Sequence, residues 1–249
     1  MFWSSRPILD EETVSWLFDI YAWAQHNLND LLNPRLIFPS NDYFPGQENS
    51  PDAMAALIFS KVSEYAGMNH WPLQLVPLQQ MENAPPLQWD GNLNNPDLVL
   101  PVPYNPIQLT NPQALIASLA HALAMYQGSQ AKELPPGGEE NWPHTTEVLA
   151  VYMGFGIMFA NSAFNVRVTS CGSCQGPSND RAAYLSQYDI TYALAVYSVL
   201  NQIHSKQVLH HLKSALHSFF KKAVKDVLQR QELQQLQRDA TAQELLQRT

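Results

Sequence analysis

The residues with the clearest chemical potential lie in the stretch SLAHALAMY, residues 118–126. Two histidines four apart on a helix, with a glutamate directly after the first, can bind zinc and place a carboxylate that deprotonates the metal-bound water. Here His121 occupies the first position, but Ala122 replaces the glutamate and Met125 replaces the second histidine. His121 and Met125 share a helical face, because they lie one turn apart. The stretch therefore predicts the place of a zinc site without the groups needed for hydrolysis.

Further stretches on either side extend this comparison beyond one motif. The chain resembles a bacterial family of uncharacterised zincin-like proteins, related in plan to minimal gluzincins, over most of residues 10–200. The stretches that carry the resemblance are RLIFPSNDYFP, ALIASLAHALAMY, TTEVLAVYMGFGIMFANSAF and AAYLSQYDITYALAVYS. The resemblance implies a zincin-like metallopeptidase fold. It also implies that Glu147 matches the acidic position that supplies the third metal ligand in members with the full histidine motif.

Departures from the family pattern decide the functional interpretation. Zinc sites in hydrolases use three protein ligands plus water, and at most His121 and Glu147 remain here. The thioether of Met125 suits Cu(I) better than Zn(II), and Ala122 cannot transfer a proton. We therefore expect no catalytic residue and no cofactor, with zinc as the only ion a residual site would take. His121, Met125 and Glu147 are interpreted as vestigial site positions.

Several alternatives remain for these side chains. His121 can be a buried imidazole that is hydrogen-bonded to Glu147 across two packed helices, or a weak metal ligand. His144, one helical turn before Glu147, is a candidate for a relocated ligand. Glu139 and Glu140, in the preceding loop, are candidates for a replacement base.

Other residues that bind metals or act as nucleophiles give weaker signals. Cys171 and Cys174 form a single Cys-x-x-Cys in a loop-like run, which lacks the four ligands of a structural zinc site and predicts free thiols or a disulfide. Four histidines near the C-terminal part are an alternative candidate for metal binding: His204, His210, His211 and His217. The chain contains no phosphate-binding loop, dinucleotide fingerprint or nucleophile elbow.

Capping residues and apolar periodicity predict the elements that must position these side chains. The N-cap candidates are Asp10, Ser50, Asn111 and Ser186. Helices are predicted from about residue 11, over about 51–66 and 112–128, from about 143 to 160, and from about 187 to 201. Apolar runs predict short strands at 36–38, 72–78 and 98–102. The fold class expected is α+β, mainly helical, with a zincin-like core, a small sheet and a long C-terminal helical extension.

The C-terminal part differs in pattern from the rest. From Lys206 onward there is neither glycine nor proline, and apolar residues repeat every three to four positions. A continuous helix of about 40 residues would reach about 60 Å, longer than a compact body, so we expect part of it to project or to fold back. We therefore divide the chain into a zincin-like domain, residues 1–205, and a helical extension, residues 206–249.

Charge separates the same two parts. The chain carries 14 Lys and Arg against 22 Asp and Glu, with net charges of −12 over residues 1–205 and +4 over residues 206–249. The acidic body argues against nucleic-acid binding. The basic tail can meet an acidic partner or the acidic body of the same chain. No membrane span or secretory signal is predicted, so a cytoplasmic location is expected.

These observations favour a pseudoenzyme, a catalytically inactive zincin-like protein that serves as a protein-binding or scaffolding module. We expect a protein partner, with the apolar tail as the element that contacts it. The alternative is a metal-dependent hydrolase or peptidase with rearranged ligands. A third hypothesis is that the former active-site cleft binds a peptide without cutting it.

Overall fold

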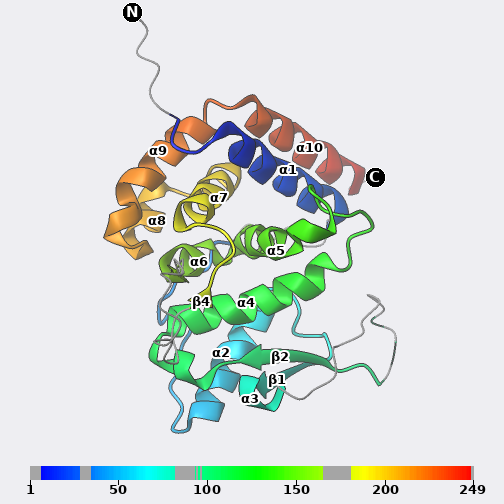
Figure 1. Cartoon of the computed structure of the whole chain (residues 1–249), viewed down its shortest axis with the longest axis vertical. Helices are drawn as coiled ribbons and strands as arrows, with labels where there is room; N and C mark the ends of the chain where they lie inside the picture. Colours follow the sequence, from blue (N-terminus) through cyan, green and yellow to red (C-terminus); the bar gives the residue numbers. More distant parts are fainter. Residues whose placement is uncertain are drawn as a thin grey trace, which may run out of the picture.

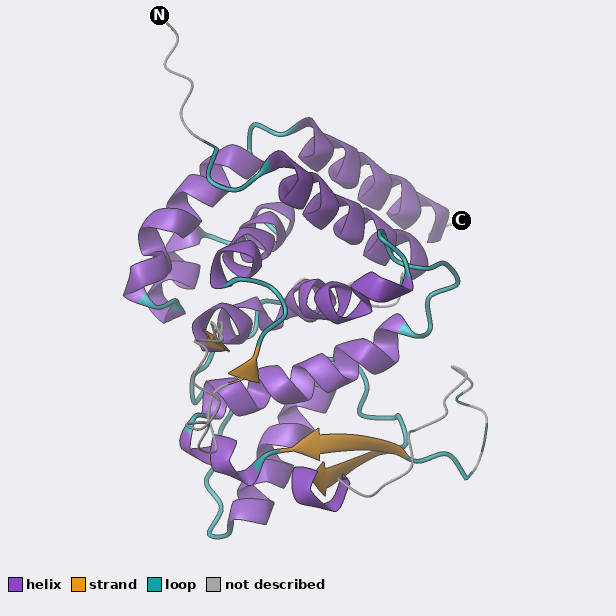
Figure 2. Cartoon of the chain, viewed as in Figure 1, coloured by secondary structure: helices purple, strands orange, loops and turns teal. Residues whose placement is uncertain are grey.

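A computed structural model of the chain describes residues 7–28, 35–81, 93, 95, 97–164 and 181–247. Most of these residues are helical, and the strands form two parallel pairs (Figure 2). The predicted class, mainly helical with a small sheet, is confirmed at this level. Within the described residues, no helix is long and apolar enough to cross a membrane.

The larger helices follow one another along the whole chain and are labelled in Figure 1. Their bounds are α1 (Glu11–Asn27), α2 (Pro51–Tyr65), α3 (Leu78–Met81), α4 (Pro112–Gly128), α5 (Trp142–Ala150), α6 (Gly156–Ser162), α7 (Gln187–Leu200), α8 (Ser205–His211), α9 (His217–Val227) and α10 (Gln231–Gln247). The strands are β1 (Leu73–Pro77), β2 (Leu100–Tyr104), β3 (Ala163–Phe164) and β4 (Arg181–Ala182).

Side-chain caps explain why the predicted helix starts are right. Asp10 accepts a hydrogen bond from the backbone N–H of Thr13 at 2.8 Å, and Ser50 and Asn111 cap α2 and α4 in the same way. Ser186, the predicted N-cap of α7, forms a capping box with Asp189. Each of these signals is local, so the sequence carries it completely.

Helix α4 lies between two layers of the molecule. On one side it packs against α5 and α6, and on the other against α2 and the β1–β2 sheet (Figure 1). Buried apolar residues on both sides belong to one core cluster. The helix that carries His121 is therefore held firmly, and the face that it turns to the end of β2 becomes the candidate site.

The predicted helix from residue 143 to 160 is interrupted. Between α5 and α6 lies a π-helical segment, η4 (Val151–Phe155), in which Gly154 has φ +96°. The carbonyl of Gly154 accepts a hydrogen bond from the backbone N–H of Ile37 at 3.0 Å. A β-carbon at this glycine would lie 2.5 Å from the carbonyl oxygen of Arg35, so only glycine fits. The single-helix prediction is wrong because a distant segment fixes this kink.

The hydrogen bond between Ile37 and Gly154 also explains why the strand predicted at residues 36–38 is wrong. Residues 36–38 are predicted to form a strand, but they have no strand partner within the described structure. Leu36 and Ile37 are buried in the core instead, and the backbone is held at Gly154. The apolar run reports burial, which a loop segment can share with a strand.

The two longer strands agree with the prediction within about two residues. β1 and β2 are parallel, and the register pairs Leu73 with Leu100 and Pro77 with Tyr104. Leu100, Val102 and Tyr104 are buried, whereas the prolines between them are partly buried. β2 thus turns one face to the core and leads directly to the cavity described below.

The C-terminal part is not one helix. α8 ends at His211, the backbone of the next residue, Leu212, is extended, and α9 and α10 follow as separate helices. The side chain of Asn161, on α6, stabilises the first break: its amide donates to the carbonyl of His211, and its oxygen accepts from the N–H of Lys213, both at 2.8 Å. The tail is therefore not a continuous helix of about 40 residues; it folds back on the body, which is one of the two arrangements expected from its length.

The apolar stripe of the tail faces the body. α9 packs on α7 and α10 packs on α1, side by side in Figure 1. The stripe residues that are buried are Val208, Leu212, Leu216, Phe220, Ala223, Val227, Leu233 and Leu236. This stripe is the reason to expect a partner at the tail, and it is covered by the chain itself.

A salt bridge also joins the tail to the acidic body. Arg230 donates to Glu11, on α1, at 2.5 and 3.0 Å, and to Asp226 at 2.9 Å. The hydrogen bond to Glu11 is the main reason that the pKa of Arg230 is raised. Arg230 of the basic tail therefore pairs with the acidic body of the same chain, which is one of the two alternatives given for the tail.

Candidate functional site

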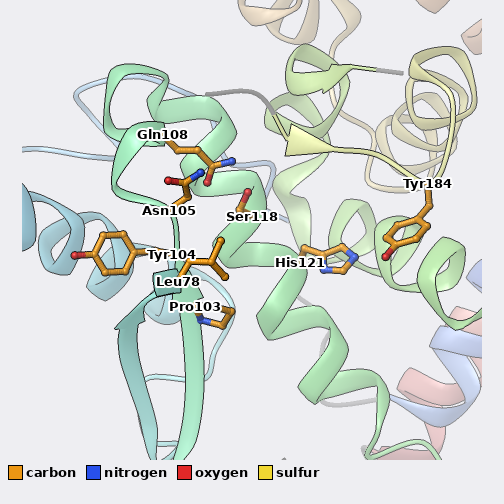
Figure 3. Close-up of a pocket in the computed structure, with 8 residues that line it drawn as sticks. All are labelled: Leu78, Pro103, Tyr104, Asn105, Gln108, Ser118, His121 and Tyr184. Carbon is orange, nitrogen blue, oxygen red and sulfur yellow. The ribbon is translucent and has the colours of Figure 1, made fainter. Parts of the chain in front are cut away.

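A cavity of about 300 Å³ lies where α4 meets the end of β2. Ser118 and His121 contribute from α4, Pro103 from β2, and Tyr184 from the connection between β4 and α7 (Figure 3). Residues three apart on a helix lie on one face, which explains why Ser118 and His121 point into the same space. Of the predicted site positions, His121 alone lines the cavity.

Met125 and Ala122 do not line this cavity. Met125 is 47% exposed, although it lies one turn after His121. Ala122 is buried in the core cluster. The two positions that carry the second imidazole and the base in the full motif thus provide neither group to the cavity.

Glu147 is fully buried on α5. Its Oε2 accepts a hydrogen bond from the backbone N–H of Leu185 at 2.8 Å. A buried carboxylate is stable only when such donors replace water. The predicted hydrogen bond between His121 and Glu147 stays a prediction, whereas the bond to Leu185 is part of the structure.

Tyr184 connects the two histidines of this region. Its ring is stacked on that of His121, with 6.2 Å between centroids, and meets the ring of His144 edge-on at 5.9 Å. Two local structures hold the short connection that carries it, since β4 pairs with β3 on one side and the Ser186 capping box follows on the other. Sequence reasoning missed Tyr184, because no motif marks a tyrosine in such a connection.

The donor set does not suit zinc, the metal that the resemblance implies. Within the described ranges, no three His, Cys, Asp or Glu side chains are grouped so as to hold a metal ion. One oxygen of Glu147 already accepts from Leu185, and Met125 lies outside the cavity. These residues do not fit a three-ligand zinc site.

Three residues at or just before the start of α5 are the candidates for a relocated metal ligand, His144, or for a replacement base, Glu139 and Glu140. His144 is partly buried, and its Nδ1 has no hydrogen-bond partner in the part of the chain that the structure describes. Its ring contacts Tyr184, so His144 and His121 both neighbour the same tyrosine. Glu139 and Glu140 are exposed on a 3-10 turn and do not line the cavity.

The histidines near the C-terminal part, His210, His211 and His217, contact neighbouring side chains and backbone outside the cavity. The ring of His211 lies 4.8 Å from that of Phe38 and 4.8 Å from that of His210, centroid to centroid. Burial, and then the nearby His210, lower the pKa of His211. The Nε2 of His217 lies 2.8 Å from the carbonyl oxygen of Leu212. These contacts are packing interactions. Cys171 and Cys174 lie outside the described residues.

The remaining walls of the cavity are neutral. Asn105 and Gln108 present carboxamides, and the hydroxyl of Ser118 points toward them rather than toward His121 (Figure 3). The ring of Tyr104 is turned away, and its hydroxyl donates to Asp52 at 2.7 Å. Burial and this hydrogen bond raise the pKa of Tyr104 to about 12, so it stays protonated at neutral pH. The cavity therefore has a hydrogen-bonding side and an aromatic side.

Comparison with known proteins gives no match. No family model, no curated protein and no solved structure is significantly similar to this chain. The resemblance to zincin-like proteins therefore remains an expectation from the sequence, and the site has to be interpreted from its own residues.

Proposed function

We propose that this chain is a non-hydrolytic, zincin-like binding protein that holds a polypeptide in the cavity beside α4. The observation that carries the proposal is the pair of substitutions in the former motif. Ala122 and Met125 stand where a base and an imidazole are required, and neither lines the cavity. The proposal keeps the pseudoenzyme interpretation but moves the binding site from the tail to the cavity, because the apolar stripe of the tail is buried.

The chemistry of peptide hydrolysis supports the absence of cleavage. A metal-dependent peptidase needs a polarised water and a group that accepts its proton. An alanine methyl group cannot accept a proton, and a thioether binds zinc poorly. The retained Glu147 is engaged by the backbone of Leu185.

The shape and lining of the cavity support retained binding. Its volume of about 300 Å³ is at the lower end of the range for ligand sites, so it fits one side chain or a short segment. His121 and Tyr184 form one wall, and such aromatic surfaces are common in recognition sites.

A peptide array tests the proposal directly. Full-length protein is incubated with a library of unmodified peptides, and bound peptides are recovered and measured by mass spectrometry. We expect a subset to bind and to be recovered intact. Ser118→Asp should weaken the binding of these same peptides, whereas Ser218→Asp, on the exposed side of α9, should not. A uniformly negative array contradicts the proposal.

Metal analysis distinguishes the competing hydrolase hypothesis. Protein purified without chelator is measured for zinc, in parallel with His121→Ala. Under the proposal, zinc is substoichiometric and no peptide is cleaved. Stoichiometric zinc that is lost in His121→Ala, together with cleavage of the bound peptides, would establish the metal-dependent hydrolase with rearranged ligands, in which His144 is the candidate ligand.

A further inference from the structure

We propose that the cavity takes one uncharged, hydrogen-bonding side chain of the carboxamide class, and that the polypeptide carrying it does not add to β2 as a strand. This inference rests on the proposed function and specifies its ligand and binding mode. Two independent observations carry it: the chemistry of the edge of β2 and the charge of the cavity walls.

The outer edge of β2 lacks backbone donors. Leu100 donates its N–H to the carbonyl of Pro72, so the edge of β2 at this residue faces β1. Backbone groups of successive residues in a strand alternate between the two edges. Val102 and Tyr104 therefore also face β1, and Pro101 and Pro103 face outward. Proline has no backbone N–H, so at Pro101 and Pro103 this edge provides no donor for the carbonyl groups of an added strand.

The outward carbonyls are also partly used. The hydroxyl of Tyr126, on α4, donates to the carbonyl of Pro101 at 2.6 Å, which independently shows that Pro101 faces away from β1. Burial raises the pKa of Tyr126 to about 12, so this donor persists at neutral pH. An incoming strand would find no donor and one occupied acceptor along β2. Proline at an exposed edge is a known protection against strand pairing.

Charge and hydrogen-bonding capacity define what the cavity can hold instead. Among the described residues that line it, none carries a formal charge except through protonation of His121. Gln108 and the hydroxyl of Ser118 can each donate and accept. Asn105 can donate through its side-chain amide, whose oxygen already accepts from the backbone N–H of Ile107 at 3.1 Å. A carboxamide donates and accepts in the same way. A buried ammonium or carboxylate would lose its hydration without gaining a counter-charge.

The aromatic wall adds to this preference. The rings of His121 and Tyr184 are nearly parallel, with 17° between their planes. The planar carboxamide of an asparagine or glutamine side chain can lie beside such an aromatic wall, and Ser118 and Gln108, which line the same cavity, are the groups that can hydrogen-bond to it. We therefore expect the side chain to enter as an anchor, with its own backbone outside the sheet.

The test uses host peptides that differ at one position. The probes are Ac-Ala-Ala-X-Ala-Ala-NH2 with X as Gln, Asn, Leu, Lys or Glu, titrated into full-length protein and followed by two-dimensional NMR. The Gln or Asn peptide is expected to bind about tenfold or more tightly than the Lys and Glu peptides, since these bury an unpaired charge. Equal affinity for the Lys or Glu peptide would overturn the carboxamide assignment.

Matched variants locate the binding. Ser118→Ala removes one hydrogen bond on a helix that tolerates alanine, so affinity for the preferred peptide should fall about threefold to tenfold. Ser218→Ala should leave it unchanged. Ser118→Asp adds a charge and should shift the preference toward the Lys peptide. No effect of either Ser118 variant would show that the peptide binds elsewhere and overturn the proposal.

Backbone methylation tests the binding mode. The preferred peptide is N-methylated at the two alanines that flank X, which removes backbone donors that strand addition needs. We expect an affinity change of less than about threefold, whereas loss of one or two backbone hydrogen bonds would cost about tenfold or more. A tenfold loss would establish strand addition while leaving the proposed function intact. If no host peptide and no library peptide binds, the proposed function itself fails.

Discussion

The carboxylate of Glu147 accepts a hydrogen bond at 2.8 Å from the backbone N–H of Leu185. Leu185 follows Tyr184, whose ring lies on His121. The acid that the resemblance assigns to a metal thus holds the connection that closes one wall of the cavity. The hydrogen bond gives this buried acid a structural role that requires no metal.

Two variants separate this structural role from metal binding. Glu147→Gln keeps a side-chain oxygen that can accept from Leu185, so we expect a small change in the free energy of unfolding. Glu147→Leu leaves the Leu185 N–H unsatisfied in a buried site and should cost about 1–3 kcal/mol more. Urea denaturation followed by circular dichroism measures both.

One result of comparing these two Glu147 variants would contradict the structural role. If Glu147→Gln is as destabilising as Glu147→Leu, the carboxylate charge matters beyond this hydrogen bond, and the assigned role is wrong. Zinc content measured on the same samples distinguishes a lost ligand from a lost hydrogen bond.

Tyr184 should matter for the cavity more than for stability. It is 57% exposed, so Tyr184→Ala should change the free energy of unfolding by less than about 1 kcal/mol. The same variant removes the ring beside His121 and should shift the imidazole proton resonances of His121 in NMR spectra. Tyr184→Phe keeps the ring and should leave those resonances nearly in place.

The peptide titration completes this test. Tyr184→Ala should weaken binding of the preferred host peptide about threefold or more, and Tyr184→Phe less, because the aromatic face is retained. Unchanged His121 resonances in Tyr184→Ala would mean that the two rings are not stacked in solution.

Local signals explain which parts of the fold were predictable. Asp10, Ser50 and Ser186 each bond to backbone groups within three residues, so the helix starts could be read from the sequence alone. The kink at Gly154 depends on Ile37, more than 100 residues away, and the break after His211 depends on Asn161. Such long-range contacts leave no periodic signal.

The candidate site shows the same division. His121 could be recognised as a candidate because the motif to which it was compared lies within one helix. Tyr184 could not, because it reaches His121 only through the folding of the connection between β4 and α7. Likewise, the apolar pattern of the tail indicated that a face is buried, but not whether another chain or the body covers it.

Packing of the tail on the body predicts that the tail is required for folding. Phe220 is fully buried on α9, against α7. Phe220→Ala should therefore cost about 3–5 kcal/mol of unfolding free energy. Leu228→Ala is the matched control, since Leu228 is 60% exposed, and should change it by about 0.5 kcal/mol or less.

Removal of the whole tail extends this prediction. A chain that ends at Ser205 exposes the face of α7 that α9 covers, so we expect it to be insoluble or to lack a cooperative unfolding transition. A truncated chain that unfolds cooperatively near the temperature of the full chain would show that residues 206–249 are a separable extension.

Gly154 provides the sharpest test of the fold around the site. Its φ of +96° is unfavourable for any residue with a β-carbon, at a cost of about 1–3 kcal/mol. In addition, the new β-carbon would lie 2.5 Å from the carbonyl oxygen of Arg35. Gly154→Ala should therefore combine backbone strain with a steric clash and displace residues 35–37 from the kink.

Gly67 isolates the first of these two costs. It also has a positive φ, +70°, but a β-carbon added there would meet no heavy atom within 4 Å among the described residues. Gly67→Ala should show the backbone strain alone, about 1–2 kcal/mol, and Gly154→Ala should be clearly more destabilising in the same urea series. Equal destabilisation by the two substitutions would mean that the 35–37 segment moves freely away from Gly154, and that the kink between α5 and α6 does not depend on this contact.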